Sequence, residues 1–255
     1  ESDFVGHTFP SFPKIKKNNS QQPIHFEFSE WQTLMKTINE YSGGVARSLI
    51  SFEEYKNLEY NKFNRRNQRN WVDLFDALWI NYYWFLRSQD CQRLRIEWFS
   101  EDKEHKEFIC RNLEPKSDRK IEDTRNMKDD AYEFFKRVLR RRPSQGWLNM
   151  PFVKRQSEGG QENQVTRNLN FLLKEVVKDC LPEFNPKNAI FTNVRHTTFR
   201  HHLEDDPTLG QYPKINDFAR NGLTSPSQLQ ATYINYISRE QSLRDSKKKM
   251  RKSDY

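Results

Sequence analysis

Cysteine, glycine and long apolar runs are all scarce in this sequence of 255 residues. Only 3 cysteines occur, at positions 91, 110 and 180, and no two of them form a Cys-x-x-Cys pair. An odd number at wide spacing argues against a disulfide framework or a zinc knuckle and favours a reducing compartment. The most apolar run, LFDALWINYYWFL at 74–86, includes Asp76 and Asn81 and is too short to span a bilayer.

Charged and aromatic side chains, in contrast, are plentiful. Charged residues make up 31% of the chain and apolar residues 35%, but the 14% of aromatic residues can fill a core in a chain of this length. The 43 Lys and Arg residues exceed the 35 Asp and Glu residues, which gives a net charge of +8 and a pI of about 9.3. This basic balance favours a polyanionic partner, most often nucleic acid. The short apolar run predicts no membrane partner.

Three regions differ in composition. Residues 1–25 contain several prolines and the run KIKKNNSQQ, which predict a flexible arm or linker. Residues 26–240 carry the apolar patterning of a folded domain, and residues 241–255 form a basic tail. Because the chain opens on Glu1, we expect it to be a fragment of a longer protein.

The apolar spacing predicts a mainly α fold with a small antiparallel β-sheet, in the α+β class. Ser29 is the expected N-cap of the first helix. The predicted strands are 93–99 and 107–113. A polar helical stretch is expected from Gly43-Gly44 to about residue 69, and a buried helix at 71–87. The other predicted helices are 28–41, 129–142, 164–180, 194–204, 213–221 and one after Pro226.

The stretch NVRHTTFRHH at 193–202 combines arginines and histidines at high density. On a helix, His196, His201 and His202 cannot all face one way, and no His-Glu-x-x-His carboxylate accompanies them, which argues against a metal site. Two interpretations stay open for this stretch, a solvated basic surface and part of an active site.

Three separated segments favour the active site when they are taken together. The first is WFLRSQDCQRLRIEWF at 84–99, the second is VRHTTFRHHLE at 194–204, and the third is SPSQLQATYINYI at 225–237. In this order and at these distances they resemble the catalytic domain of the tyrosine recombinase family, the phage-type integrases. The resemblance covers residues 26–240 and implies the fold of that domain.

The resemblance implies two active-site arginines. Arg87, followed by Asp90, matches the family's first arginine, with Phe85 where glycine is usual. Arg195 matches the second arginine, in the pattern His-x-x-Arg-His-Thr, where Thr192 replaces the first histidine. His196 and Thr197 are then expected to be the packing context of Arg195.

It also implies a nucleophile and a general acid. Tyr233 matches the family's nucleophilic tyrosine, with Tyr236 as the rival position. Counting back from Tyr233 by the family's spacing gives Thr224 where a histidine or tryptophan is usual. The family's lysine lies on a β-hairpin between the arginines, and Lys116 in EPKSDRK is the best match, with Arg119 and Lys120 close by.

These residue types suit DNA strand exchange without metal or cofactor. A tyrosine forms a covalent link that keeps the phosphodiester energy, and two arginines match the charge that develops on the attacked phosphate. A lysine can protonate the departing 5′ oxygen as a general acid. Threonine at positions 192 and 224 can donate a hydrogen bond but cannot carry a proton as imidazole does.

Each candidate also has a purely structural interpretation. Arg87 could cap the helix that ends near residue 86, Lys116 could belong to a solvated loop, and Tyr233 could be a core aromatic. Thr192 and Thr224 could cap helices. We expect His201 and His202 to be surface or DNA-facing residues without a catalytic role.

The sequence therefore predicts a site-specific DNA recombinase (integrase) from a phage or other mobile element, acting through a 3′-phosphotyrosine. Its partners are double-stranded DNA and, by family resemblance, further copies in a tetramer. The implied location is the host cytoplasm, at the nucleoid, with a separate N-terminal DNA-binding domain. A degenerate relative that binds DNA without cleaving it is the alternative. An RNA-binding protein is disfavoured because the aromatic strands of RNA-recognition modules are missing from the sequence.

Overall fold

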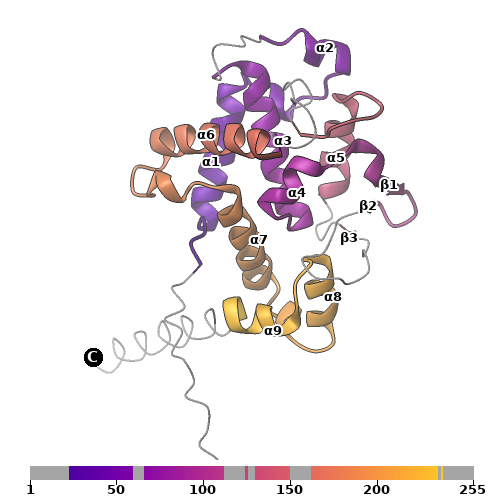
Figure 1. Cartoon of the computed structure of the whole chain (residues 1–255), viewed down its shortest axis with the longest axis vertical. Helices are drawn as coiled ribbons and strands as arrows, with labels where there is room; N and C mark the ends of the chain where they lie inside the picture. Colours follow the sequence, from indigo (N-terminus) through magenta and orange to yellow (C-terminus); the bar gives the residue numbers. More distant parts are fainter. Residues whose placement is uncertain are drawn as a thin grey trace, which may run out of the picture.

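The computed structural model describes residues 23–59, 66–111, 124–125, 130–149, 162–234 and 237. This part of the chain is mainly helical with one small antiparallel sheet, as predicted (Figure 1). The expected arm and tail lie largely outside the described residues, so their bounds stay predictions. The helices are α1 (Phe28–Tyr41), α2 (Phe52–Lys56), α3 (Gln68–Trp84), α4 (Ser88–Arg93), α5 (Ala131–Arg140), α6 (Glu162–Cys180), α7 (Phe191–Asp205), α8 (Lys214–Asn221) and α9 (Pro226–Leu229).

Most of the predicted helices are confirmed to within a few residues. The polar stretch before residue 69 is wrong as a continuous helix, since its described part contains only the 3₁₀ turn Val45–Arg47 and α2. The N-cap of α1 is Glu27 and not Ser29, because Glu30 accepts a hydrogen bond from the Glu27 backbone N–H at 2.7 Å. A carboxylate three residues after Glu27 completes a capping box there, so the helix begins before Ser29.

The predicted strand 93–99 is largely wrong. β1 runs over Phe99–Asp102 and pairs antiparallel with β2 (Glu107–Cys110), to which β3 (Thr124–Arg125) adds. Residues Ile96–Trp98 form a 3₁₀ turn, and the Ile96 N–H donates to the carbonyl of Gly146 at 2.8 Å. A local alternation of apolar residues predicted a strand, but a contact with a distant loop supplies the hydrogen bonds here.

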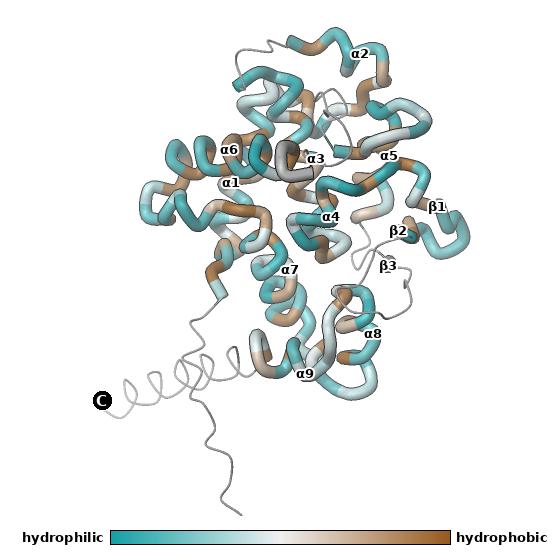
Figure 2. The backbone as a smooth tube through the Cα atoms, viewed as in Figure 1, coloured by the Kyte–Doolittle hydropathy of each residue, from teal (hydrophilic) through white to brown (hydrophobic). Residues whose placement is uncertain are grey.

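α3 is the central helix, and its residues are buried around most of its circumference. Figure 2 shows hydrophobic and hydrophilic residues alternating along the helices around it, as amphipathic elements require. On α3, Tyr82 stacks on Trp31 of α1 with ring centroids 5.2 Å apart. The C-cap of α3 is Phe85, which has a left-handed φ of 53° and a fully buried ring. Phenylalanine thus adopts the strained conformation that glycine takes readily, and burial of its ring offsets the cost.

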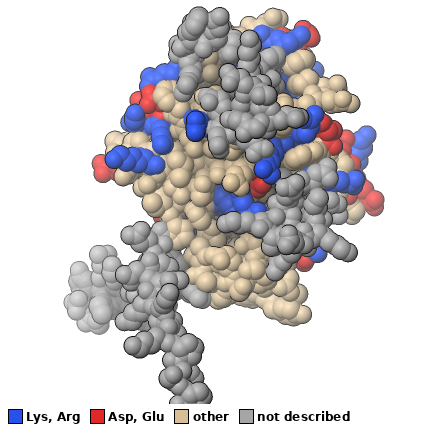
Figure 3. Space-filling model, in the orientation of Figure 1, with Lys and Arg blue, Asp and Glu red and all other residues tan. Residues whose placement is uncertain are grey.

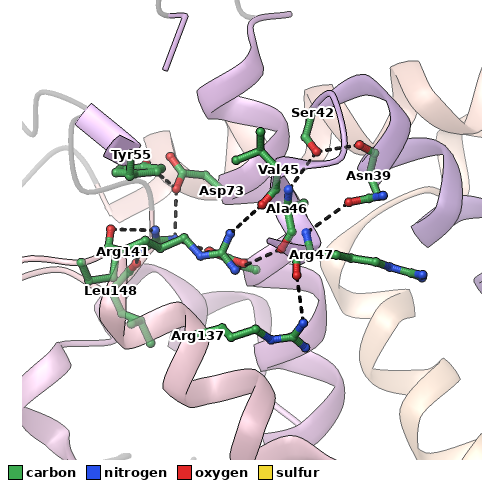
Figure 4. Close-up of polar contacts among 12 residues, drawn as sticks. Asn39, Ser42, Val45, Ala46, Arg47, Tyr55, Asp73, Arg137, Arg141 and Leu148 are labelled. Atoms are coloured by element: carbon green, nitrogen blue, oxygen red, sulfur yellow. Dashed lines mark hydrogen bonds and ion pairs between the residues drawn. The ribbon is translucent and has the colours of Figure 1, made fainter. Parts of the chain in front are cut away.

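A buried ionic network ties α3 to the end of α5 (Figure 4). The Arg142 guanidinium lies 3.0 Å from the Asp73 carboxylate and 2.8 Å from that of Asp76. Tyr55 donates to Asp73 at 2.6 Å, and Arg141 donates to the Ala46 carbonyl at 3.0 Å. Buried charges need such partners, because an unpaired one costs several kcal/mol. These arginines therefore serve the fold and are not available to DNA.

The described residues form two hydrophobic clusters. The larger one lies among α1, α3, α5 and α6. The smaller one, named here the C-terminal cluster, joins α7 to α8 and α9, which form a separate lobe in Figure 1. Its buried members are Phe85, Phe199, Leu203, Ile215, Phe218, Ala219, Leu229, Tyr233 and Ile237. Phe85, at the junction of α3 and α4, also belongs to this cluster. The C-terminal lobe therefore contacts the rest of the protein two residues before Arg87.

Candidate active site

Arg87 stands at the N-cap of α4, two residues after the left-handed Phe85. Its backbone N–H donates to the Asp90 carboxylate at 2.9 Å, which explains why an acid follows three residues after the arginine. Its guanidinium donates to the carbonyl of Leu223 at 2.6 Å. Arg87 does not cap α3, which ends at Trp84, but extends towards the loop between α8 and α9.

Arg195 extends from α7 to the same loop. Its guanidinium donates to the carbonyls of Phe85 and Gly222, the latter at 2.6 Å, and lies 5.0 Å above the ring of Phe199. Burial, together with the nearby charge of Arg87, lowers the pKa of Arg195 to about 10. The two guanidinium groups therefore meet at consecutive carbonyls, although the arginines come from distant segments.

Tyr233 lies in the π-helical turn Gln230–Ile234 that continues α9. Its ring packs on Phe199 at a centroid distance of 5.0 Å, and the side chain is 8% exposed. Its hydroxyl lies 2.5 Å from Nδ1 of His196 on α7. Burial raises the pKa of Tyr233 well above its ordinary value, and the charge of Arg195 opposes that shift. π turns are rare in proteins, and those that occur often lie at functional sites.

The histidines of α7 differ from the sequence prediction. His201 and His202, expected at the surface, are 4% and 2% exposed. His201 lies between the Phe26 carbonyl, at 2.9 Å, and the Tyr82 hydroxyl, at 3.3 Å, while Nδ1 of His202 is 2.8 Å from the Thr198 carbonyl. Hydrogen-bond partners from other elements satisfy His201. The ring of His202 packs against the rings of Tyr82 and Phe85, with centroid distances of 5.4 and 4.8 Å. Among the described residues, no group of three potential metal ligands is found.

His196 is the residue that the sequence interpretation missed. The sequence places it, together with Thr197, in the packing around Arg195. Thr197 is fully buried and accepts the Phe26 N–H at 2.8 Å. His196 instead contacts the candidate nucleophile. No local signal could reveal this contact, because its partner lies on a later element.

The two threonines occupy different environments. Thr192 is exposed in the first turn of α7, whose N-cap is Ile190. Thr224 is half-buried directly after the carbonyls that accept Arg195 and Arg87, and its N–H donates to Ala219 at 3.0 Å. The N-cap of α9 is Ser225, so neither threonine is a helix cap. Lys116, Arg119, Lys120 and Tyr236 lie outside the described residues.

Charged groups are mixed on the face seen in Figure 3. Lys and Arg atoms alternate with Asp and Glu atoms along its upper and right-hand edges, and the lower part, over α8 and α9, is mostly uncharged. Blue atoms also lie in the middle of this face. A hollow of about 490 Å³ lies elsewhere, between α1 and α3, and none of the candidate catalytic residues lines it. No described helix is long and apolar enough to cross a bilayer.

Comparison with known proteins gives a match at the level of fold. No protein-family model matches the chain, and no curated protein does. Among solved structures, the chain is similar to the Tn1549 transposon integrase in complex with transposon right end DNA. That match has a TM-score of 0.50 at 14% identity and covers 89% of this chain and 68% of the integrase chain. The same integrase in complex with a circular intermediate DNA matches at a TM-score of 0.49 and 13% identity, over 85% of this chain and 63% of that one.

Proposed function

We propose that this chain is the catalytic domain of a tyrosine recombinase, which cleaves and rejoins DNA through a covalent 3′-phosphotyrosine without metal. The observation that supports it most is the meeting of Arg87 and Arg195 at one loop, with Tyr233 packed beside them on Phe199. The integrase-like fold of the described residues is consistent with this proposal.

The arginines bind the scissile phosphate. A guanidinium has five N–H donors in a rigid fork. Arg87 directs one of them at Leu223, and Arg195 directs two at Phe85 and Gly222. These bonds fix the orientation of both side chains before DNA arrives, and the remaining donors hold the phosphate oxygens on which charge develops.

Tyr233 attacks the phosphorus that the arginines hold. Lys116 protonates the departing 5′ oxygen, and Thr192 and Thr224 each donate a hydrogen bond to the phosphate. Double-stranded DNA is the partner, several copies assemble on it as a tetramer, and the protein acts at the nucleoid in the cytoplasm of its host. Its biological role is DNA integration by a phage or another mobile element.

A DNA-binding relative that no longer cleaves is the second candidate. Two observations favour it: the threonines at positions 192 and 224, and the burial of Tyr233, which is 8% exposed. Such a protein keeps its affinity for DNA when Tyr233 is replaced, because the arginines and not the phenol hold the phosphate.

A covalent-capture experiment separates the two candidates. The chain is incubated with pools of nicked, labelled DNA, and denaturing gels report a protein–DNA adduct while native gels report binding. Tyr233→Phe is compared with Tyr236→Phe and with Tyr212→Phe, a matched control at a side chain that is 84% exposed. We expect an adduct that only Tyr233→Phe abolishes. Binding without adduct in every variant contradicts the cleavage function and supports the second candidate.

A further inference from the structure

We infer that His196 is a further catalytic residue, the base that takes the phenolic proton of Tyr233 during cleavage and returns it during rejoining. This inference rests on the proposed function. It assigns the proton transfer to a histidine one helical turn away from Thr192, the position at which the family resemblance expects one.

The geometry of the pair carries the inference. Nδ1 of His196 lies 2.5 Å from the Tyr233 oxygen, within hydrogen-bond reach of the proton to be removed. The rings are tilted by 44° with centroids 5.8 Å apart, so they meet at their edges and not face to face. A neutral imidazole with its proton on Nε2 can accept the phenolic O–H at Nδ1.

Thr192 cannot perform this step. Its side chain is exposed in the first turn of α7, and a hydroxyl does not take up a proton at neutral pH. Residues four apart lie on the same face of a helix, so His196 presents an imidazole on the face of α7 that carries Thr192. Although Thr192 replaces the histidine expected at that position, the imidazole of His196 still lies beside Arg195 and Tyr233.

The groups around His196 keep it neutral in the unliganded protein. Arg195 and Arg200 flank it on α7, His25 and Glu27 come from the segment before α1, and Tyr233 faces it from the π turn. Burial, then the charge of Arg195 and then that of His25, lower the pKa of His196 to about 4. Neutral imidazole is the form that accepts a proton.

DNA binding strengthens this base. A phosphate held by Arg195 adds a negative charge beside the arginine that depresses the proton affinity of His196, so the affinity rises when the substrate is in place. Attack on phosphorus simultaneously makes the phenol more acidic. His196 is thus a weak base in the free protein and a competent one in the complex.

The proton and bond changes balance. The phenolic proton moves to Nδ1 of His196 while the Tyr233 oxygen bonds to phosphorus and the bond from phosphorus to the 5′ oxygen breaks. The 5′ oxygen receives its proton from the proposed acid Lys116. Rejoining reverses each transfer, and the imidazolium returns its proton to the departing phenolate.

Adduct formation with the full chain and the nicked DNA pool tests the base. The variants are His196→Asn and His196→Ala, with His105→Asn as a matched control at an exposed histidine in the turn between β1 and β2. We expect the rate to fall about 10²-fold or more in both His196 variants, with DNA affinity within threefold of the wild type. Imidazole in the buffer restores part of the rate of His196→Ala, and the acid limb of the wild-type pH profile disappears in that variant.

The outcomes separate this inference from the proposed function. An adduct that Tyr233→Phe abolishes but His196→Asn forms at the wild-type rate overturns the base and leaves the recombinase intact. His196→Ala can also form the adduct more slowly, with an acid limb like that of the wild type and without rescue by imidazole. This result overturns the base, because a structural role of His196 then explains the lower rate. Absence of an adduct with the wild type overturns both.

A spectroscopic measurement covers the case in which the variants fail to fold. Nitrogen NMR of the wild-type histidine rings at pH 7 reports which nitrogen of His196 carries the proton. We expect a neutral ring with its proton on Nε2. A proton on Nδ1 overturns the inference, because that nitrogen then cannot accept from Tyr233.

Discussion

Thr192 and His196 show how exposure separates two neighbouring positions on one helix. Thr192 is exposed, so its replacement leaves no cavity and no buried group without a partner. We expect Thr192→Ala to change the free energy of unfolding by less than about 0.5 kcal/mol. Adduct formation should fall less than about tenfold, because a single hydrogen bond contributes about 1 kcal/mol. Urea unfolding and the adduct assay measure both, and a 10²-fold loss of rate contradicts this assignment of Thr192.

Because His201 is buried, we expect the free energy of unfolding to depend on pH. Burial lowers its pKa to about 4, below the ordinary value of 6.5. The unfolded chain therefore binds more protons between these two values, and stability falls as the pH falls from 6.5 towards 4. His201→Gln keeps hydrogen-bonding capacity without titrating, so we expect a shallower loss of stability between pH 7 and pH 5. Urea unfolding at the two pH values measures the difference, and equal losses in both proteins contradict the prediction.

The candidate site residues differ in how well the sequence predicts their positions. Arg87, Arg195 and Tyr233 are recognisable because each lies in a local pattern of neighbours, and the structure brings all three together. His196 is not, because its role depends on a hydroxyl from another element. Polar residues are expected at the surface by default, so the burial of His201 and His202 follows only from distant contacts. These are the Phe26 carbonyl and the Tyr82 hydroxyl for His201, and the rings of Tyr82 and Phe85 for His202.

At the scale of elements, the loop between α8 and α9 positions the two arginines of the candidate site. Gly222 and Leu223 offer their carbonyls to Arg195 and Arg87, and a methyl group on Gly222 would lie 2.5 Å from the ring of Phe199. That ring is 1% exposed and packs against both Phe218 and Tyr233. A side chain at position 222 therefore cannot be accommodated without moving the loop or the ring.

We expect Gly222→Ala to destabilise the C-terminal cluster by about 1–3 kcal/mol, as overpacking does. Displaced carbonyls also release the two guanidinium groups, so adduct formation should fall more than DNA binding. Hydrogen exchange measures the local destabilisation, with Gly44→Ala as a control for the loss of a glycine. Gly44 has φ 81°, but no atom lies within 4 Å of an added methyl group. Normal exchange in α8 and α9 contradicts the prediction.

The elements themselves were predictable where their apolar period is long. α1, α5 and α6 agree with the sequence because their buried residues repeat every three or four positions. α7 also agrees, although its residues from Thr197 to Leu203 are all buried. The strand at 93–99 failed because a short alternation does not decide between a strand and a turn. The bridge between Arg95 and Trp147 and the bond from Ile96 to Gly146 settle that conformation from outside the segment.

At the scale of the whole molecule, the basic balance predicts salt-dependent DNA binding. The chain has a net charge of +8, and each neutralised phosphate releases counterions. We expect the affinity for double-stranded DNA to fall about 10³-fold between 50 and 200 mM salt, as for about six phosphate contacts. Fluorescence anisotropy of labelled duplexes measures it, and an affinity independent of salt contradicts the prediction.

The basic tail provides a control for that measurement. Replacement of Lys247, Lys248 and Lys249 by glutamine should make the salt dependence shallower without changing the adduct formed at saturating DNA. Contacts to phosphates position a protein without reading sequence, so the loss should be similar for unrelated duplexes. A loss confined to one DNA sequence contradicts this role of the tail.

The sequence by itself determined the mainly helical class, the small sheet and the identity of the residues that bear the candidate chemistry. Periodicity and local motifs record these features, because they depend on neighbours within a few turns. Only the tertiary structure decided that Arg87 and Arg195 bind consecutive carbonyls, that His196 contacts Tyr233, and that Arg141 and Arg142 are committed to buried carboxylates. Each of these contacts joins elements that are far apart in the chain. The packing of the two hydrophobic clusters, and not the local sequence pattern, brings those elements together.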